Sequence, residues 1–209
     1  MNITRRVEVF VWHESPLVRA GLAATLAERS DLQVTVAPWS DGPARGPGCD
    51  VIVADYATAM HCLEVLSTRS TSGGGAAPRV MVVTARDGEW DIRNATTRGA
   101  QGYLLLGCSA DRIIDAVSSL ARGARFYDDA VSARIADSLV HASLTKREHD
   151  VLQQMSQGAG NKEIARTLDI QLGTVKAHVK AILGKLQARS RTQAVVVAEH
   201  RGLLRMMYE

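Results

Sequence analysis

The first two thirds of the chain alternate short apolar runs with segments of helical periodicity. Apolar, β-branched runs of four or five residues predict strands, and apolar residues recurring every three or four positions predict helices. The predicted strands are residues 7–11, 32–36, 51–54, 80–84 and 102–106. The predicted helices between them are residues 16–28, 59–69, 90–98 and 111–122. Strands joined by helices indicate a parallel sheet that is covered on both faces.

Polar residues stand where three of the predicted strands end. His13 and Glu14 follow the first strand, Asp55 follows the third, and Thr84 closes the fourth. In an open parallel sheet the carboxyl ends of the strands are the usual place for a binding site. We therefore expect these four residues to share one site.

Two connections depart from the strand and helix alternation. PWSDGPARGPG at residues 38–48 is too rich in proline and glycine for a crossover helix, which we expect to be very short or missing. TSGGGAAP at residues 71–78 predicts a flexible loop. Residues 128–140 predict one more amphipathic helix, with Val131, Ile135 and Leu139 at four-residue spacing, which we interpret as a linker.

Residues 144–209 predict four short helices. The stretch Thr145-Lys146-Arg147-Glu148 is a capping box that begins the first, and Gly158 stands where a helix C-terminal glycine belongs. NKEIARTL at residues 161–168 forms the second, and after a turn at residues 169–173 a third begins at Thr174. Two short helices joined by a tight turn predict a helix-turn-helix unit, whose second helix enters the major groove of DNA.

The predicted third helix has one apolar and one basic face. The apolar face consists of Val175, Val179, Ile182 and Leu186. Lys176, Ala177 and Lys180 point away from it, with His178 to one side. Such lysines can meet guanine edges or phosphates, and the alanine can contact a thymine methyl group. A solvated basic face is the alternative interpretation.

The last predicted helix offers a phosphate contact and a dimer surface. Ser190-Arg191-Thr192-Gln193 predicts a second capping box, and the helix N-terminus together with Arg191 suits a backbone phosphate. The run at residues 195–197, VVV, is too apolar for a solvated helix. We therefore expect part of this helix to face a second subunit.

Charge, composition and cysteine usage narrow the class of protein. Residues 1–143 carry 14 basic against 16 acidic side chains, whereas residues 144–209 carry 11 basic against 6 acidic side chains and all five lysines. The C-terminal part is therefore the one expected to bind a polyanion.

Cys49, Cys62 and Cys108 fit neither a disulfide framework nor a zinc motif. With no apolar run long enough to span a bilayer, we expect a cytoplasmic protein without membrane contact. No nucleophile–base pair or complete metal site is visible, so we expect neither an enzyme nor a cofactor.

The run LTKREHDVLQQMSQGAGNKEIARTLDIQLGTVKAHVKAILGKLQARSRTQAVVVA resembles the LuxR-type helix-turn-helix domain. The resemblance implies that Lys176, Ala177 and Lys180 read bases. It also places six residues near phosphates: Asn161, Lys162, Thr174, Ser190, Arg191 and Thr192. One departure is Gln171, where the family commonly has a Ser or Thr that caps the recognition helix, and Thr174 is the candidate substitute.

The preceding α/β part resembles the receiver domain of NarL/FixJ-type response regulators. The matching pieces are PLVRAGL after the first strand, CDVIVAD ending in Asp55, VMVVTA with Thr84, and GAQGYLLL with Tyr103. The resemblance implies a flavodoxin-like, doubly wound sheet of five parallel strands. It implies that an aspartate at Asp55 accepts phosphate, that an acidic pair holds magnesium with a lysine nearby, and that Thr84 and Tyr103 relay the change.

The implied phosphorylation pocket departs from the family pattern at several positions. His13-Glu14 replaces the acidic pair, and Leu106 replaces the lysine. An imidazole prefers softer metals than magnesium, and the lost lysine removes the second cation that phosphoryl transfer requires. No lysine precedes Lys146, which leaves Arg86 as the candidate cation.

A further departure follows the acceptor position, where Thr58-Ala59 replaces the usual Met-Pro. We therefore interpret the receiver as atypical, with a degenerate pocket that holds no metal. We expect His13, Glu14 and Asp55 to pair as a neutral hydrogen-bonded cluster, because two carboxylates side by side require a proton or a cation between them.

These inferences combine into one organisation: a receiver at residues 1–122, a linker helix at 123–142 and a four-helix DNA-binding domain at 143–209. The expected protein is a homodimeric transcription regulator on a pseudo-palindromic double-stranded operator. Its control is constitutive or ligand-responsive, and RNA polymerase is a further candidate partner. Two alternatives stay open: a conventional phospho-switch that uses Asp55, and a protein-interaction module without sequence-specific DNA binding.

Overall fold

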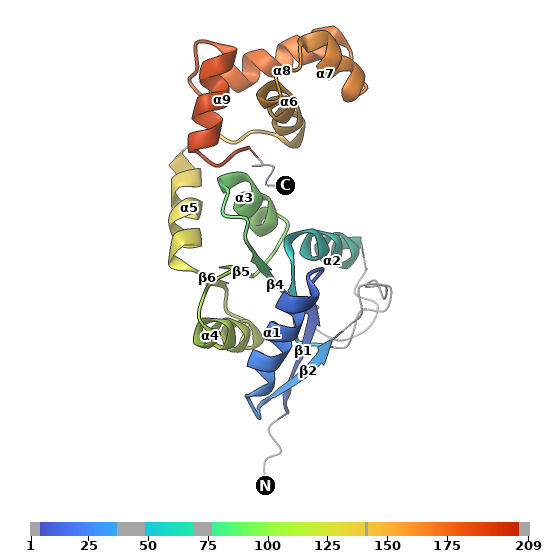
Figure 1. The fold of residues 1–209 in the computed structure, drawn as a ribbon, viewed down its shortest axis with the longest axis vertical. Helices are drawn as coiled ribbons and strands as arrows, with labels where there is room; N and C mark the ends of the chain where they lie inside the picture. Colours follow the sequence, from blue (N-terminus) through green and yellow to red (C-terminus); the bar gives the residue numbers. More distant parts are fainter. Residues whose placement is uncertain (1–4, 37–48, 69–76, 141, 205–209) are drawn as a thin grey trace. The chain divides into compact units, whose positions relative to one another are not determined.

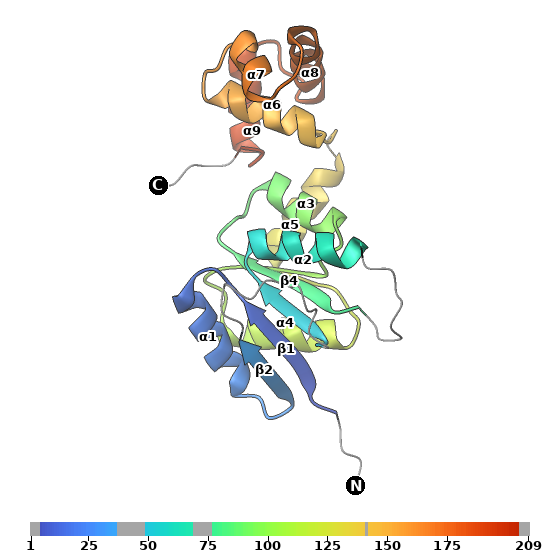
Figure 2. The same cartoon turned by 90° about the vertical axis from the view of Figure 1, so that its right-hand side faces the viewer.

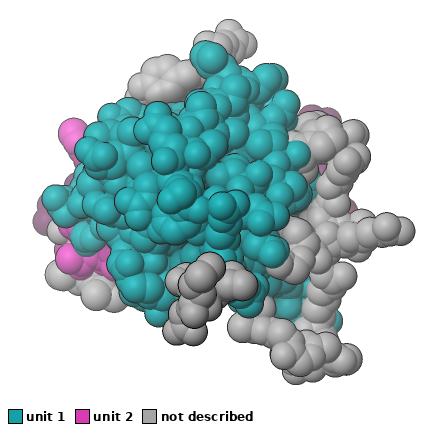
Figure 3. All heavy atoms as spheres, turned by 90° about the horizontal axis from the view of Figure 1, so that it is seen from below, with its two compact units in different colours: residues 1–86, 94–132 teal, residues 87–93, 133–209 magenta. Residues whose placement is uncertain are grey.

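The computed structural model describes residues 5–36, 49–68, 77–140 and 142–204. The chain divides into two compact units, residues 1–86 with 94–132 (unit 1) and residues 87–93 with 133–209 (unit 2). Figure 3 shows unit 1, in teal, as a closely packed body of atoms. The two proline- and glycine-rich connections, predicted at 38–48 and 71–78, lie wholly or mainly outside the described residues.

Unit 1 is built on a parallel sheet in the order β2-β1-β3-β4-β5-β6 (Figure 1). The strands are β1 (Val7–Trp12), β2 (Leu32–Val36), β3 (Val51–Ala54), β4 (Arg79–Thr84), β5 (Gly102–Leu105) and β6 (Phe126–Tyr127). All five predicted strands are present, and the order of the first five is the flavodoxin-like one. The sixth strand was not predicted, because two residues are too few to show a periodicity.

The helices that accompany the sheet also follow the predicted alternation. They are α1 (Pro16–Ala27), α2 (Tyr56–Thr68), α3 (Glu89–Thr97) and α4 (Ala110–Ala121). Figure 2 shows α1 and α4 on one face of the sheet and α2 on the other. Because both faces are covered, β3 is buried along its whole length, which explains its uninterrupted apolar sequence VIVA.

Side-chain alternation along the strands builds the core beneath α1 and α4. Successive strand residues point to opposite faces, so alternate residues of neighbouring strands meet the same helices. The buried residues of this cluster are Val9, Val11, Leu22, Leu26, Leu32, Val51, Val53, Met81, Val83, Leu104, Ala116, Val117 and Leu120. This rigid layer fixes the strand ends that carry the predicted pocket.

Helix α5 (Asp129–Val140) follows β6 and corresponds to the predicted linker helix. Its first turn belongs to unit 1 and its remainder, from Ala133, to unit 2. Val131 is fully buried, whereas the side chain of Leu139 lies outside the described residues. The first turn of α5 therefore carries a fully buried apolar side chain.

The C-terminal part of unit 2 contains the four predicted helices, α6 (Lys146–Ser156), α7 (Asn161–Thr167), α8 (Leu172–Lys185) and α9 (Arg191–His200). The predicted capping box of α6 is complete, with Thr145 and Glu148 bonding each other's backbone N–H groups. Gly158 has φ +83°, as expected of a glycine that follows a helix. None of the described helices is both long and apolar enough to cross a membrane.

Two local predictions in this part are wrong. Helix α8 begins at Leu172 rather than Thr174, with Gln171 as N-cap and no side-chain cap bond. The preceding turn contains Asp169, which has φ +50°. The second capping box is only half formed. Ser190 accepts from the Gln193 N–H, but the Gln193 side chain accepts from the Arg189 N–H instead of closing on Ser190.

Candidate phosphorylation pocket and DNA-binding surface

A cavity of about 380 Å³ lies at the carboxyl ends of the central strands. It is lined by His13, Glu14, Ser15, Val18, Asp55, Tyr56, Ala57, Thr84, Ala85, Arg86 and Leu106. Five of the six residues predicted for the pocket therefore line one cavity. The sixth, Tyr103, does not line it, because its side chain is fully buried behind Arg86 and donates its hydroxyl to the Arg86 carbonyl at 2.7 Å.

The Asp55 carboxylate is already occupied by hydrogen bonds. Its Oδ2 accepts from the Glu14 N–H at 2.9 Å and from the Thr58 hydroxyl at 2.7 Å, and its Oδ1 accepts from the Thr58 N–H at 3.0 Å. The residue is only 5% exposed. The carboxylate thus caps the start of α2 and connects it to the β1–α1 junction.

His13 has a structural role at the same junction. It is 4% exposed, and its Nδ1 accepts from the Ser15 N–H at 3.1 Å. The proton of a neutral imidazole then lies on Nε2, which is buried and has no hydrogen-bond partner among the described residues. Ser15 in turn caps α1. The histidine therefore orients the start of α1, and its remaining nitrogen is a donor rather than a metal ligand.

The predicted hydrogen-bonded cluster of His13, Glu14 and Asp55 side chains is not formed. Each of the two buried side chains instead bonds the backbone N–H of a neighbouring residue. Backbone donors at the ends of strands and starts of helices require partners, and these two acceptors supply them. Among the described residues, no group of three or more His, Cys, Asp or Glu side chains is arranged to hold a metal ion.

The remaining pocket residues leave one side apolar and the other cationic. Leu106 is 42% exposed, so its side chain reaches the surface at the cavity. Arg86 lies with its guanidinium carbon 4.9 Å from the centre of the Tyr56 ring, and its N–H donates to the Thr84 hydroxyl at 3.3 Å. The guanidinium therefore stacks on an aromatic face of the cavity wall.

The three cysteines are free thiols, two of them buried, as expected. Burial raises the pKa of Cys49 to about 12 and that of Cys62 to about 11. Burial also raises the pKa of Cys108. Thiols with raised pKa values stay protonated near neutral pH and are poor nucleophiles.

Helix α8 presents the predicted basic face to solvent. Val175 and Ile182 are fully buried and Leu186 nearly so, which turns Lys176, Ala177 and Lys180 outward, all three of them exposed. His178 is half-buried at the edge of this face, and Thr174 is exposed in the first turn. The arrangement leaves one long, unobstructed side of the helix for a groove of DNA.

The residues predicted near phosphates divide into two kinds. Lys162, Ser190 and Thr192 are exposed, and Asn161 is half-buried at the start of α7. Arg191 differs, because its guanidinium already donates to the Ala159 carbonyl at 2.6 Å. This bond joins α9 to the turn before α7, so Arg191 has a structural contact besides any contact with DNA.

The sequence did not predict an ion pair that joins α8 to α6. Lys185, in the last turn of α8, donates to the Glu148 carboxylate of α6 at 2.5 Å. The side chain of Glu148 is 7% exposed, and the same oxygen accepts from the Thr145 N–H. Burial raises the pKa of Glu148, but the bonds from Lys185 and Thr145 outweigh it, and the net pKa is lowered.

A parallel-sheet unit with a pocket at its strand ends, followed by a four-helix unit with an exposed basic helix, defines a receiver joined to a helix-turn-helix. Residues 142–198 match the model of the luxR family of bacterial regulatory proteins. The chain is 32% identical over 201 residues to the nitrate/nitrite response regulator NarL of Escherichia coli strain K12, covering 88% of this chain and 90% of NarL. It is 31% identical over 215 residues to the transcriptional regulatory protein YxjL of Bacillus subtilis, covering 95% and 98%.

The chain therefore belongs to the NarL-type response regulators with a luxR-family DNA-binding domain, a class of transcription regulators and not of enzymes. A similar solved structure is RcsB of Salmonella enterica serovar Typhimurium bound to promoter rprA. It has a TM-score of 0.61 at 14% identity, over 93% of this chain and 99% of RcsB. At that identity the similarity concerns the fold.

Proposed function

We propose that this regulator binds a pseudo-palindromic operator as a homodimer and reads its sequence with α8. The exposed face formed by Lys176, Ala177 and Lys180 carries this proposal, with His178 at its edge. Asn161, Lys162, Thr174, Ser190, Arg191 and Thr192 then contact phosphates. The corresponding domains are a receiver at residues 1–122, a linker at 123–142 and a DNA-binding domain at 143–209.

The proposed mode of control does not use conventional phosphorylation of an aspartate. The observation that supports it is that both oxygens of Asp55 accept hydrogen bonds from Thr58 or Glu14, beside Leu106 where a lysine would supply positive charge. Phosphoryl transfer depends on cations that neutralise the developing charge. A constitutive dimer or a ligand that occupies the cavity replaces the phosphate in this scheme.

Intact-mass measurement after incubation with acetyl phosphate and magnesium tests the mode of control, beside an Asp55→Asn variant and with operator binding assayed on the same samples. We expect no phosphoryl adduct and equal operator binding with and without the reagent. An adduct that disappears in the variant, together with tighter binding, would establish a conventional phospho-switch and overturn this part of the proposal.

Selection from random double-stranded DNA tests the first part. We expect an enriched sequence with two symmetric half-sites about one helical turn apart, because a two-fold symmetric dimer presents two recognition helices at that spacing. An unenriched pool would favour the protein-interaction module. RNA polymerase is a proposed partner of the bound dimer, and a two-hybrid or pull-down assay on operator DNA checks it.

A further inference from the structure

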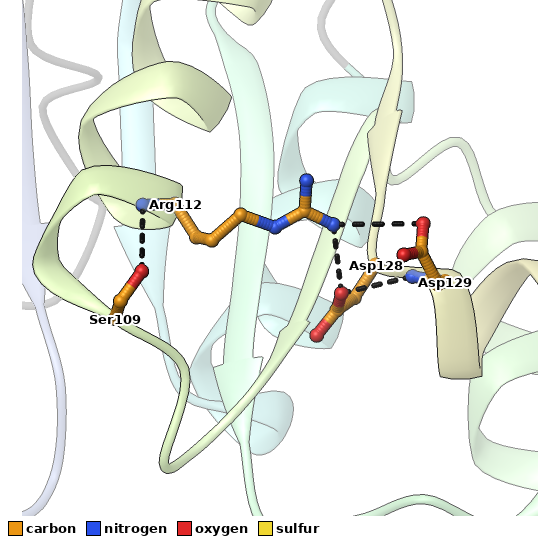
Figure 4. A network of polar contacts seen from close by, with 4 residues as sticks. All are labelled: Ser109, Arg112, Asp128 and Asp129. Atoms are coloured by element: carbon orange, nitrogen blue, oxygen red, sulfur yellow. Dashed lines mark hydrogen bonds and ion pairs between the residues drawn. The ribbon is translucent and has the colours of Figure 1, made fainter.

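The first turn of the linker helix is held on the receiver by a cluster of charged side chains (Figure 4). Asp128 is the residue before α5, and its carbonyl accepts from the Ser132 N–H at 2.7 Å, which begins the helix. The Asp128 Oδ1 accepts from the Asp129 N–H at 2.8 Å and from the Arg112 guanidinium of α4 at 2.9 Å. One carboxylate thus serves both the start of α5 and an ion pair with α4.

Arg112 is itself fixed from several sides. Its guanidinium carbon lies 5.1 Å from the centre of the Phe126 ring, and its Nη2 lies 3.6 Å from the Asp129 carboxylate. Its backbone N–H donates to Ser109, the N-cap of α4. The hydrogen bond from Arg112 lowers the pKa of Asp128, so the pair stays ionised at neutral pH. A guanidinium that contacts a ring and two carboxylates joins the start of α5 to α4 within unit 1.

Tyr103 connects this cluster to the cavity. The Tyr103 carbonyl accepts from the Asp128 N–H at 3.4 Å, and the Tyr103 hydroxyl donates to the carbonyl of Arg86, which lines the cavity. Strand pairing aligns Tyr103 with Tyr127, the residue before Asp128. A continuous set of contacts within unit 1 therefore runs from the cavity to the first turn of the linker helix.

We propose that Arg112 is a positioning residue for DNA binding. By holding Asp128, it restricts the directions in which the linker helix leaves the receiver, and so restricts how the two DNA-binding domains of a dimer reach two half-sites. The inference rests on the proposed homodimer and its paired half-sites. A restricted linker whose geometry matches the operator raises the effective concentration of the second domain at the second half-site.

The test compares full-length Arg112→Ala and Asp128→Asn with the unchanged protein. Asparagine is as good an N-cap as aspartate, so the second variant removes the charge while keeping the start of α5. Arg29→Ala is the matched control, because Arg29 forms a two-bond ion pair with Asp31 in the same unit but far along the chain from α5. Circular dichroism melts show that each variant is folded.

Each protein is titrated with three DNA duplexes: one half-site, two half-sites at the selected spacing, and two half-sites moved apart by half a helical turn. For Arg112→Ala and Asp128→Asn we expect affinity for the correctly spaced pair of half-sites to fall by about tenfold, with affinity for one half-site unchanged. We also expect them to lose less affinity than the unchanged protein when the spacing is wrong. A merely structural role would lower affinity for all three duplexes alike.

Three results would overturn the inference, and they are distinguishable. If the unchanged protein prefers paired half-sites and both variants keep that preference and its dependence on spacing, Arg112 does not position the domains. If the unchanged protein binds one and two half-sites equally, the proposed dimer on paired half-sites is wrong, and the inference falls with it. Loss of the preference in Arg29→Ala as well would assign the effect to general destabilisation and equally exclude a positioning role.

Discussion

At the scale of single residues, the pocket is defined by what its polar atoms already bond. Asp55 and His13 keep their places at the strand ends, but each supplies an acceptor for a backbone N–H group. The Thr58 hydroxyl completes the set on Asp55. Both side chains thereby fix the starts of helices, Asp55 that of α2 and His13 that of α1.

The contribution of Thr58 to stability can be measured directly. Replacing it by valine keeps its shape and leaves a buried Asp55 oxygen short of a donor, which we expect to cost about 1–2 kcal/mol in the free energy of unfolding. Thr68→Val is the control, because Thr68 is exposed in the same helix and bonds only its own helix backbone. Urea denaturation should show the loss in the first variant, and an equal change in both would refute the role assigned to Thr58.

The second prediction at this scale concerns Lys180. Because its side chain is exposed on the outer face of α8, Lys180→Ala should weaken binding to the selected operator by about 1–3 kcal/mol if it reads a base edge. Binding to random DNA should change much less. Fluorescence anisotropy on both duplexes checks this, and an equal loss on both would assign Lys180 to a phosphate instead.

At the scale of elements, the recognition helix depends on a pair of residues that no local pattern links. Lys185 and Glu148 are 37 positions apart, and the carboxylate that closes the capping box of α6 also holds the last turn of α8. The packing of α8 against α6 therefore depends on an ionised Glu148.

This tie predicts a dependence of stability on pH. The pKa of Glu148 is lowered in the folded protein, so the pair stabilises the fold above the unfolded-state pKa of about 4.3, and this contribution is lost as the pH falls through the lower folded value. Urea unfolding of the helix-turn-helix domain, measured between pH 3 and 7, should show that its free energy of unfolding declines at the acid end. In Glu148→Gln that decline should be shallower, and an unchanged acid slope would contradict the assignment.

Elements with strong periodicity were predicted from the sequence, and short or contact-dependent features were not. The buried run VIVA and the apolar face of α8 identified β3 and the recognition helix, because burial itself imposes the pattern. Strand β6 and the early start of α8 have no periodic signal. The Arg112–Asp128 pair and the bonds on Asp55 join residues whose proximity only the fold creates, so five of the six predicted pocket residues could be placed together while their bonding could not.

At the scale of the whole molecule, charge is divided between the two parts of the chain. Residues 1–143 carry a net charge of −2 and residues 144–209 a net charge of +5. A polyanion is therefore attracted to the DNA-binding domain and not to the receiver. This favours encounters in which the DNA-binding domain meets the DNA.

The dependence of operator affinity on salt concentration tests this uneven distribution of charge. Two of the candidate phosphate contacts in each protomer are charged, Lys162 and Arg191. For a dimer, raising salt from 50 to 200 mM should therefore lower operator affinity by about 100-fold or more. Lys162→Ala removes one charged contact from each protomer, so it should reduce the slope of log affinity against log salt by about 2 while leaving sequence preference unchanged. A flat salt response would exclude the proposed phosphate contacts, and a changed sequence preference would exclude Lys162 from this role.

The position of Thr58 also bears on how this receiver could be rebuilt. Restoring an acidic residue at His13 and a lysine at Leu106 would return two charges to the cavity, yet the Asp55 carboxylate would still be bonded through both oxygens to Thr58. Replacing this threonine as well would remove the hydroxyl bond to Oδ2, whereas the backbone N–H would keep its bond to Oδ1 with any residue but proline. A designer who adds the two charges must therefore choose residue 58 together with them.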